Sequence, residues 1–319
     1  MTKYLVWLLL SSLSFALTIL TPIETIEVNG TAKDMVLDDN RLVVATDMGH
    51  IEIHDIVTKK KIKEIYLPDI TDFMGDVIPA RIMSTDVIGD TFLLLSDSGK
   101  GGYINLFLYE NNSTKLLISY KDKKTLVKAR FIDSTHILLG YLSNEVSLFN
   151  IETKKERYRV QLNESKFSDF ALNESKSQVV FSCESGILNV VDVQSGKLVK
   201  ELAGKNVDNV YRVDFKNGTV SAAGQDRRGV VYDAKSGKGS YVEGDFLIYA
   251  TALSPSASKV AFSMDEKNDI SIYATNSHSK NFLLKGQKST LNVIIFKDEN
   301  ILFSASDDNS ILVWDLAKK

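Results

Sequence analysis

The stretch that decides the fold is SASDDNSILVWD, at residues 304–315. Its centre is a polar turn of Asp, Asn and Ser. An apolar run, ILFSAS, precedes the turn, and a second run, ILVWD, follows it. Short runs rich in β-branched and aromatic residues, joined by such a turn, are typical of an antiparallel hairpin. The question is whether this hairpin is isolated or one copy of a repeat.

The hairpin is the last of seven copies. When the third run of each copy is aligned on Asp315, the equivalent positions are 55, 110, 150, 192, 233 and 274. The last six copies are therefore 40, 42, 41, 41 and 41 residues apart, whereas the first gap is 55 residues and contains an insertion. Each copy holds four short apolar runs separated by polar turns, and four strands in about 40 residues predict one propeller blade. We therefore expect an all-β, seven-bladed β-propeller spanning residues 17–319.

The ring also has a predicted closure. The seventh copy ends soon after its third strand and lacks a fourth. Residues 23–28, with the sequence IETIEV, form an unassigned strand before the first copy. We expect this strand to complete the last blade, because that arrangement joins the two ends of the chain and covers an open sheet edge.

The repeat resembles the WD40 family, most clearly at residues 304–315. Only the last copy has the Trp-Asp pair, at Trp314 and Asp315, and the Gly-His pair that opens a typical WD40 blade is absent. In that family a His, a turn Asp and the Trp form a hydrogen-bonded network. We expect most of this network to be lost here, so that apolar burial and ladder hydrogen bonds hold the blades together.

The first residues, MTKYLVWLLLSSLSFA, have the features of a secretory signal peptide. Lys3 precedes a short apolar run, and small residues, Ser14 and Ala16, occupy the positions that a signal peptidase reads. We expect residues 1–16 to be removed and the remainder to be a soluble, periplasmic monomer without a membrane anchor. The net charge of -3 gives no reason to expect nucleic acid as a partner.

A second resemblance concerns function. A secreted, divergent seven-bladed chain rich in Lys, Asn and Ile, with a leader ending in Ser14-Phe15-Ala16, is similar to the NapL-type accessory family of the periplasmic nitrate reductase system. This resemblance implies a non-catalytic accessory role without a cofactor, with the catalytic subunit of that reductase as partner. The alternatives are a general exported scaffold unrelated to nitrate, and a metal-dependent propeller hydrolase or lactonase.

The sequence offers little support for catalysis. In a strand, His50 and His54 lie on one face but about 13 Å apart, too far to share one ion. Cys183 is the single cysteine and lies in an apolar strand, where an inert core thiol is expected. Carboxylates recur in the turns between second and third strands and are expected to cap those turns; they are Asp47, Asp97, Glu184, Asp226, Asp265, Asp307 and Asp308. We expect no catalytic, cofactor-binding or metal-binding residues.

The insertion after the first copy is the best candidate for a binding site. Residues 68–79 read PDITDFMGDVIP, in a connection that the other copies keep shorter. Long connections of this kind are often functional, and exposed Phe and Met beside Asp suit a protein contact. We expect Asp72, Phe73, Met74 and Asp76 to contact a protein partner; simple packing on the surface is the alternative.

Overall fold

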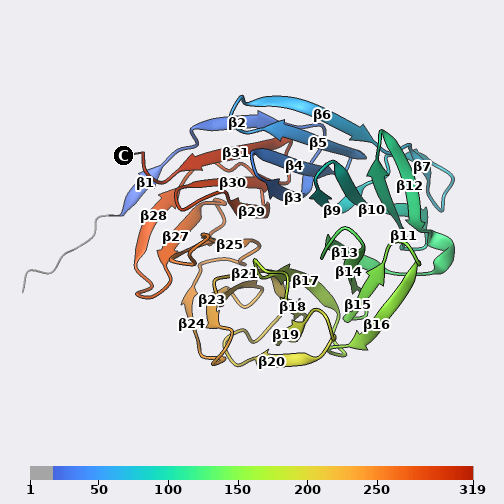
Figure 1. Cartoon of the computed structure of the whole chain (residues 1–319). Coiled ribbons are helices and arrows are strands. Elements are labelled where there is room, and N and C mark those ends of the chain that lie inside the picture. The colour runs from blue at the N-terminus through green and yellow to red at the C-terminus, as the bar shows by residue number, and fades with distance from the viewer. Residues whose placement is uncertain (1–16, 319) are drawn as a thin grey trace, which may run out of the picture.

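The computed structural model describes residues 17–318, and this part of the chain forms seven mainly antiparallel sheets arranged as the blades of a ring, with one small two-stranded sheet besides (Figure 1). The predicted seven-bladed β-propeller is confirmed. The predicted signal peptide, residues 1–16, lies outside the described residues.

Each blade has a β-meander order, with its first strand nearest the axis and its fourth at the rim (Figure 1). Blades one to three contain β3 (Ala32–Asp38), β4 (Arg41–Thr46), β5 (His50–Asp55) and β6 (Lys60–Tyr66); β9 (Ile82–Ile88), β10 (Thr91–Lys100), β11 (Tyr103–Glu110) and β12 (Ser113–Ile118); and β13 (Leu126–Phe131), β14 (His136–Tyr141), β15 (Glu145–Asn150) and β16 (Lys155–Gln161). A short 3-10 helix, η1 (Tyr120–Asp122), connects blades two and three.

The remaining four blades follow the same order. Blades four and five contain β17 (Phe167–Leu172), β18 (Gln178–Cys183), β19 (Leu188–Asp192) and β20 (Leu198–Leu202), then β21 (Val210–Lys216), β22 (Thr219–Gly224), β23 (Arg228–Asp233) and β24 (Gly239–Glu243). Blades six and seven contain β25 (Thr251–Leu253), β26 (Lys259–Ser263), β27 (Ile270–Ala274) and β28 (Lys280–Leu284), then β29 (Leu291–Phe296), β30 (Ile301–Ser306) and β31 (Ser310–Asp315). All seven third strands end at the positions that the sequence alignment predicts.

The predicted ring closure is confirmed by strand β2 (Glu24–Glu27). It pairs with β31 in antiparallel register, with Ile26 opposite Ile311. The Ile23 amide donates to the Val313 carbonyl at 2.8 Å, one residue before the strand begins. The N-terminal strand therefore completes blade seven.

A further closing strand, β1 (Thr18–Leu20), was not expected from the sequence. It runs parallel to β28 and makes blade six five-stranded. Leu20 is buried in the cluster between blades six and seven. The residues before blade one thus pair with both blade six and blade seven, which strengthens the junction where the two ends of the chain meet.

Apolar side chains fill the space between neighbouring blades, and glycines make room for large ones. A Cβ at Gly140 would lie 3.0 Å from the Phe167 ring, and one at Gly229 would lie 2.8 Å from the Phe262 ring. Both rings belong to the next blade around the ring. Small and large residues therefore alternate across these interfaces, as close packing requires.

Blade seven has a buried polar network that was not expected from the sequence; it contains the Trp of the family's network but neither its His nor its turn Asp. The Trp314 indole donates to Ser304 Oγ at 2.8 Å, and the Ser304 hydroxyl donates to Gln287 Oε1 at 2.8 Å. The Gln287 amide then donates to Ser306 Oγ at 2.6 Å. Gln287 lies in the connection before blade seven, so an amide joins this connection to the blade where the family would use a His.

Candidate functional site

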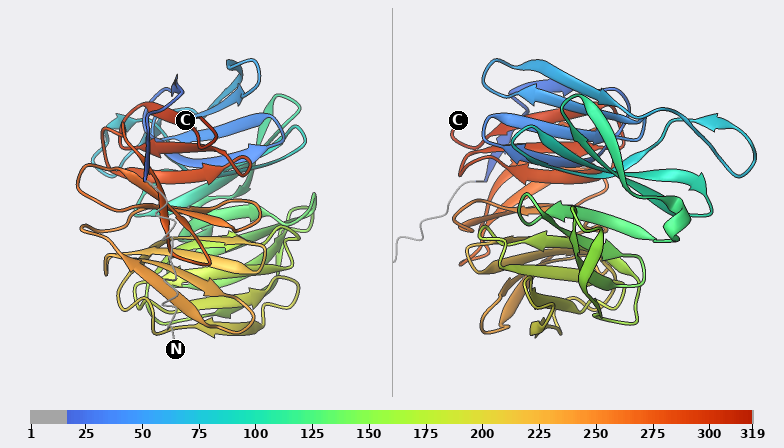
Figure 2. Two further views of the ribbon diagram at one scale, coloured as in Figure 1. Left: turned by 90° about the vertical axis from the view of Figure 1, so that its left-hand side faces the viewer. Right: turned by 45° about the vertical axis from the view of Figure 1, so that its right-hand side comes forward.

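The insertion after blade one is a separate hairpin. It consists of β7 (Ile70–Thr71) and β8 (Val77–Ile78), which pair in antiparallel register. The hairpin extends away from the body of the ring (Figure 2, right). It is anchored beside β10, because a Cβ at Gly99 would lie 2.5 Å from the Thr71 carbonyl oxygen. Gly99, which also has a φ of +68°, permits this close approach.

Asp72 organises the tip of the hairpin. Its Oδ1 accepts hydrogen bonds from the amides of Met74 at 2.8 Å and Asp76 at 2.9 Å. Gly75 adopts a φ of +96° and completes the turn. The Asp72 carboxylate therefore satisfies the backbone inside the turn, as Asp commonly does.

The apolar side chains of the tip are almost fully exposed. Phe73 is 85% exposed and Met74 is 74% exposed. Val77, which sequence reasoning did not select, is 71% exposed. The structure therefore brings the four predicted residues together in one turn, with Asp72 serving the backbone and the apolar residues facing solvent. The position of Val77 in β8 could not be inferred without the hairpin register.

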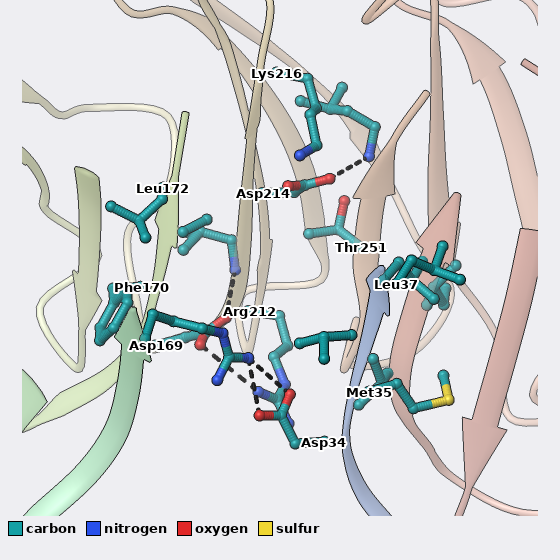
Figure 3. A pocket seen from close by; sticks show the side chains of 18 of the residues that line it. Asp34, Met35, Leu37, Asp169, Phe170, Leu172, Arg212, Asp214, Lys216 and Thr251 are labelled. Atoms are coloured by element: carbon teal, nitrogen blue, oxygen red, sulfur yellow. Dashed lines mark hydrogen bonds and ion pairs between the residues drawn. The ribbon is translucent and has the colours of Figure 1, made fainter. Parts of the chain in front are cut away.

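A second candidate site is the channel along the axis of the ring, which a propeller is expected to have but whose functional residues were not identified from the sequence. A cavity of about 380 Å³ is bounded by the first strands of the blades, and a cavity of about 230 Å³ adjoins it. Four charged residues line both cavities and so lie between them; they are Asp34, Lys128, Asp169 and Arg212. Asp34, Asp169 and Arg212 point towards one another (Figure 3).

β-Bulges direct these side chains into the channel. The pairing register between first and second strands shifts just before each of Asp34, Lys128, Asp169 and Arg212. A bulge turns the following side chain out of the regular alternation of the strand. Polar residues consequently face the axis, while their neighbours remain in the apolar interfaces between blades.

Several channel carboxylates connect adjacent blades. Asp34 accepts from the amide of Thr85 at 2.9 Å, and Asp86 accepts from the amide of Phe131 at 2.7 Å. Two more blade-to-blade bonds of this kind run from the amide of Val213 to Asp169 and from the amide of Leu253 to Asp214. These carboxylates thus have a structural role in joining first strands around the ring.

Ion pairs join the same carboxylates to buried cations. The Arg130 guanidinium lies 2.8 Å from Asp34, and the Lys128 ammonium lies 2.6 Å from Asp169. Burial alone would raise the pKa of Asp169, but the charges of Lys128 and Arg212 overcome this effect and hold the pKa below its usual range. Asp169 is therefore ionised at neutral pH.

The two histidines of the His50–His54 segment contact carboxylates within blade one. His54 Nε2 lies 3.0 Å from Glu52, while His50 Nδ1 lies 2.8 Å from Glu64. The Asn29 amide donates to the buried Glu52 at 2.8 Å. The two histidines therefore have different carboxylate partners. Within residues 17–318, no cluster of three or more His, Cys, Asp or Glu has the arrangement to hold a metal ion.

Three of the turn carboxylates, Asp226, Asp265 and Asp308, accept from amides of their own turns, as expected. Asp47 instead accepts from the Thr31 amide at 2.8 Å, and Asp226 also accepts from the Val207 amide at 2.8 Å. These two bonds join the turn to the connection that precedes the blade.

Comparison with known proteins adds no relative. Neither a protein-family model nor a curated protein sequence matches the chain. The fold is consistent with a WD40-like propeller. Across residues 17–318, no helix is long and apolar enough to span a membrane.

Proposed function

We propose that this protein is a non-catalytic binding scaffold that uses the β7–β8 hairpin to contact a protein partner. A propeller fold suits such a role, because a closed ring holds its connecting loops in fixed positions. The observation that carries the proposal is the exposure of Phe73, Met74 and Val77 at the tip of a well-formed turn. These side chains add little to the stability of the ring, because they contact water rather than the core.

The charge of the hairpin defines the complementary surface. Residues 68–79 contain three Asp and neither Lys nor Arg. The partner should therefore offer an apolar pocket that accepts Phe73 and Met74, with basic side chains around its rim. Apolar anchors surrounded by polar contacts are the usual arrangement of a protein interface.

The proposed partner is the catalytic subunit of the periplasmic nitrate reductase, and the proposed location is the periplasm. The resemblance to the NapL-type accessory family supports the partner. The leader-like sequence of residues 1–16 supports export. Mass spectrometry of the protein from a periplasmic extract tests export, and the expected N-terminus is Leu17.

The binding test uses purified proteins. The double variant Phe73→Ser/Met74→Ser should lose at least tenfold in affinity for the reductase subunit while keeping the melting temperature of the parent protein. Val57→Ser is the matched control, because Val57 is 63% exposed but lies in the turn between β5 and β6. Equal binding by the parent protein and the double variant would remove the hairpin from the proposal.

A gene deletion tests the partner independently of the hairpin. Loss of periplasmic nitrate reductase activity, with the catalytic subunit still exported, is the expected result. Unchanged activity would remove the nitrate partner and leave a general exported scaffold. Turnover of ester or lactone substrates by the purified, metal-supplemented protein would favour the alternative of a propeller hydrolase or lactonase.

A further inference from the structure

Arg212 makes fewer hydrogen bonds than Arg130, the other arginine of the channel. Arg130 donates to Ser84 Oγ at 2.7 Å and to the Thr85 carbonyl at 2.9 Å, in addition to its ion pair with Asp34. Arg212, by contrast, has a single long contact of 3.6 Å with Asp169. Its guanidinium donates no hydrogen bond to any other residue in the part of the chain that the structure describes.

The ion-paired charges nearest to Arg212 are three cations, Lys128, Arg130 and Arg212, and two carboxylates, Asp34 and Asp169. The rest of the larger cavity has three acids and two bases, so the charges of its lining balance as a whole; these are Asp86, Glu174, Asp214, Lys176 and Lys216. The attraction for an anion is therefore local to Arg212, whose donors are nearly unused.

Lys128 lies beside the same charges. Burial lowers the pKa of Lys128, and repulsion from Arg130 and Arg212 adds to this effect against the attraction of Asp169 and Asp34. A bound anion would reduce the repulsion among the three cations.

The opposite wall of the larger cavity is apolar. Val36, Val293 and Ile295, from blades one and seven, line it and are partly accessible. A ligand that fills this cavity therefore meets apolar carbon on one side and Arg212 on the other. Its volume of about 380 Å³ lies within the usual range for small-molecule sites.

We propose that the central channel binds a monocarboxylate with an apolar body, with the carboxylate on Arg212 and the body against Val36, Val293 and Ile295. The forked guanidinium matches the two oxygens of a carboxylate. A dianion is disfavoured, because Asp34 and Asp169 lie beside the same position. The carboxylate can belong to a free small molecule or to the C-terminus of an extended peptide, and neither source requires the β7–β8 hairpin.

The test compares hexanoate with its neutral amide, hexanamide, by calorimetry and by thermal shift on the purified protein. Hexanoate should bind saturably, and hexanamide should bind at least tenfold more weakly. Arg212→Gln should lower the affinity for hexanoate at least tenfold, whereas Arg212→Lys should retain part of it. Arg157→Gln is the control, because Arg157 pairs with Gln194 away from the channel and its loss should leave binding unchanged.

A second arm identifies the source of the carboxylate. An acetylated Leu-Leu peptide with a free C-terminus is compared with its C-terminal amide. Tighter binding of the free-acid peptide than of hexanoate assigns the channel to peptide ends, and the reverse order assigns it to small carboxylates. Absence of binding by both carboxylates, equal binding of acid and amide, or full binding by folded Arg212→Gln would overturn the proposal.

Discussion

The buried network of blade seven yields a sharp stability prediction through Gln287→Leu. Leucine has nearly the volume of glutamine, so the change removes hydrogen bonds with little change in packing. The hydroxyl of Ser304 loses its acceptor, and Ser306 Oγ loses its donor. Leaving a buried polar group without a partner costs about 1–3 kcal/mol, and the added apolar burial offsets part of that cost. The expected loss in the free energy of unfolding is about 2 kcal/mol.

A double-mutant cycle with Ser306→Ala tests the reasoning by urea denaturation. Ser306→Ala alone should cost about 1–2 kcal/mol, because the Gln287 amide then lacks an acceptor. In the double variant both ends of this hydrogen bond are gone, so its cost should be at least 1 kcal/mol smaller than the sum of the single costs. Gln194→Leu, at an exposed position, should change the free energy of unfolding by less than about 0.5 kcal/mol. If the cost of the double variant equals the sum of the two single costs to within about 0.5 kcal/mol, the hydrogen bond between Gln287 and Ser306 is refuted.

Three further predictions concern the ring. Ile26→Asp places a charge where the closing strand packs on the core and should cost about 2 kcal/mol in urea unfolding, whereas Thr25→Asp, on the exposed side, should cost under about 0.5 kcal/mol. Asp214→Ala leaves the Leu253 amide of the next blade without its acceptor and should cost about 2–4 kcal/mol in the same assay. Burial alone would raise the pKa of Glu52, but hydrogen bonds from His54 and Asn29 overcome it and lower the pKa. The stability that Glu52 contributes is therefore present at neutral pH and is lost as the pH falls through the acid range. Glu52→Gln should flatten the pH dependence of the free energy of unfolding below about pH 5, and an unchanged slope would contradict this.

Periodicity made the architecture predictable. Seven third strands at nearly constant spacing, together with an unassigned strand at residues 23–28, contain enough information for the blade number and the ring closure. Strand β1 was not predictable, because three residues beside an apolar leader carry no pattern that distinguishes them from the leader. Gln287 was missed for another reason. An amide can replace a His as the hydrogen-bonding partner only when the packing of the blade brings it to Ser304, and sequence similarity to a family motif does not reveal this.

The two candidate sites also differ in how far they can be predicted from the sequence. The hairpin was predictable from residues 68–79, because an insertion, a turn and exposed apolar residues are all local features. The channel cluster combines Asp34, Lys128, Asp169 and Arg212, which lie in four different blades. Aligning the first strands would have shown charged residues where apolar ones are expected. Their pairing, however, depends on the bulges and on the order of the blades around the axis.

At Phe73 and Arg212 the proposed role in binding is most clearly separate from any role in folding. The channel carboxylates accept backbone hydrogen bonds across blade interfaces, so their presence follows from the fold. The structure gives no comparable reason for an exposed Phe73 or for an Arg212 whose donors are nearly unused. An exposed phenyl ring and a guanidinium with one long ion pair both contribute little to folding, whereas each gains free energy when a complementary ligand covers it. Substitution at either residue should therefore change binding while leaving the propeller intact.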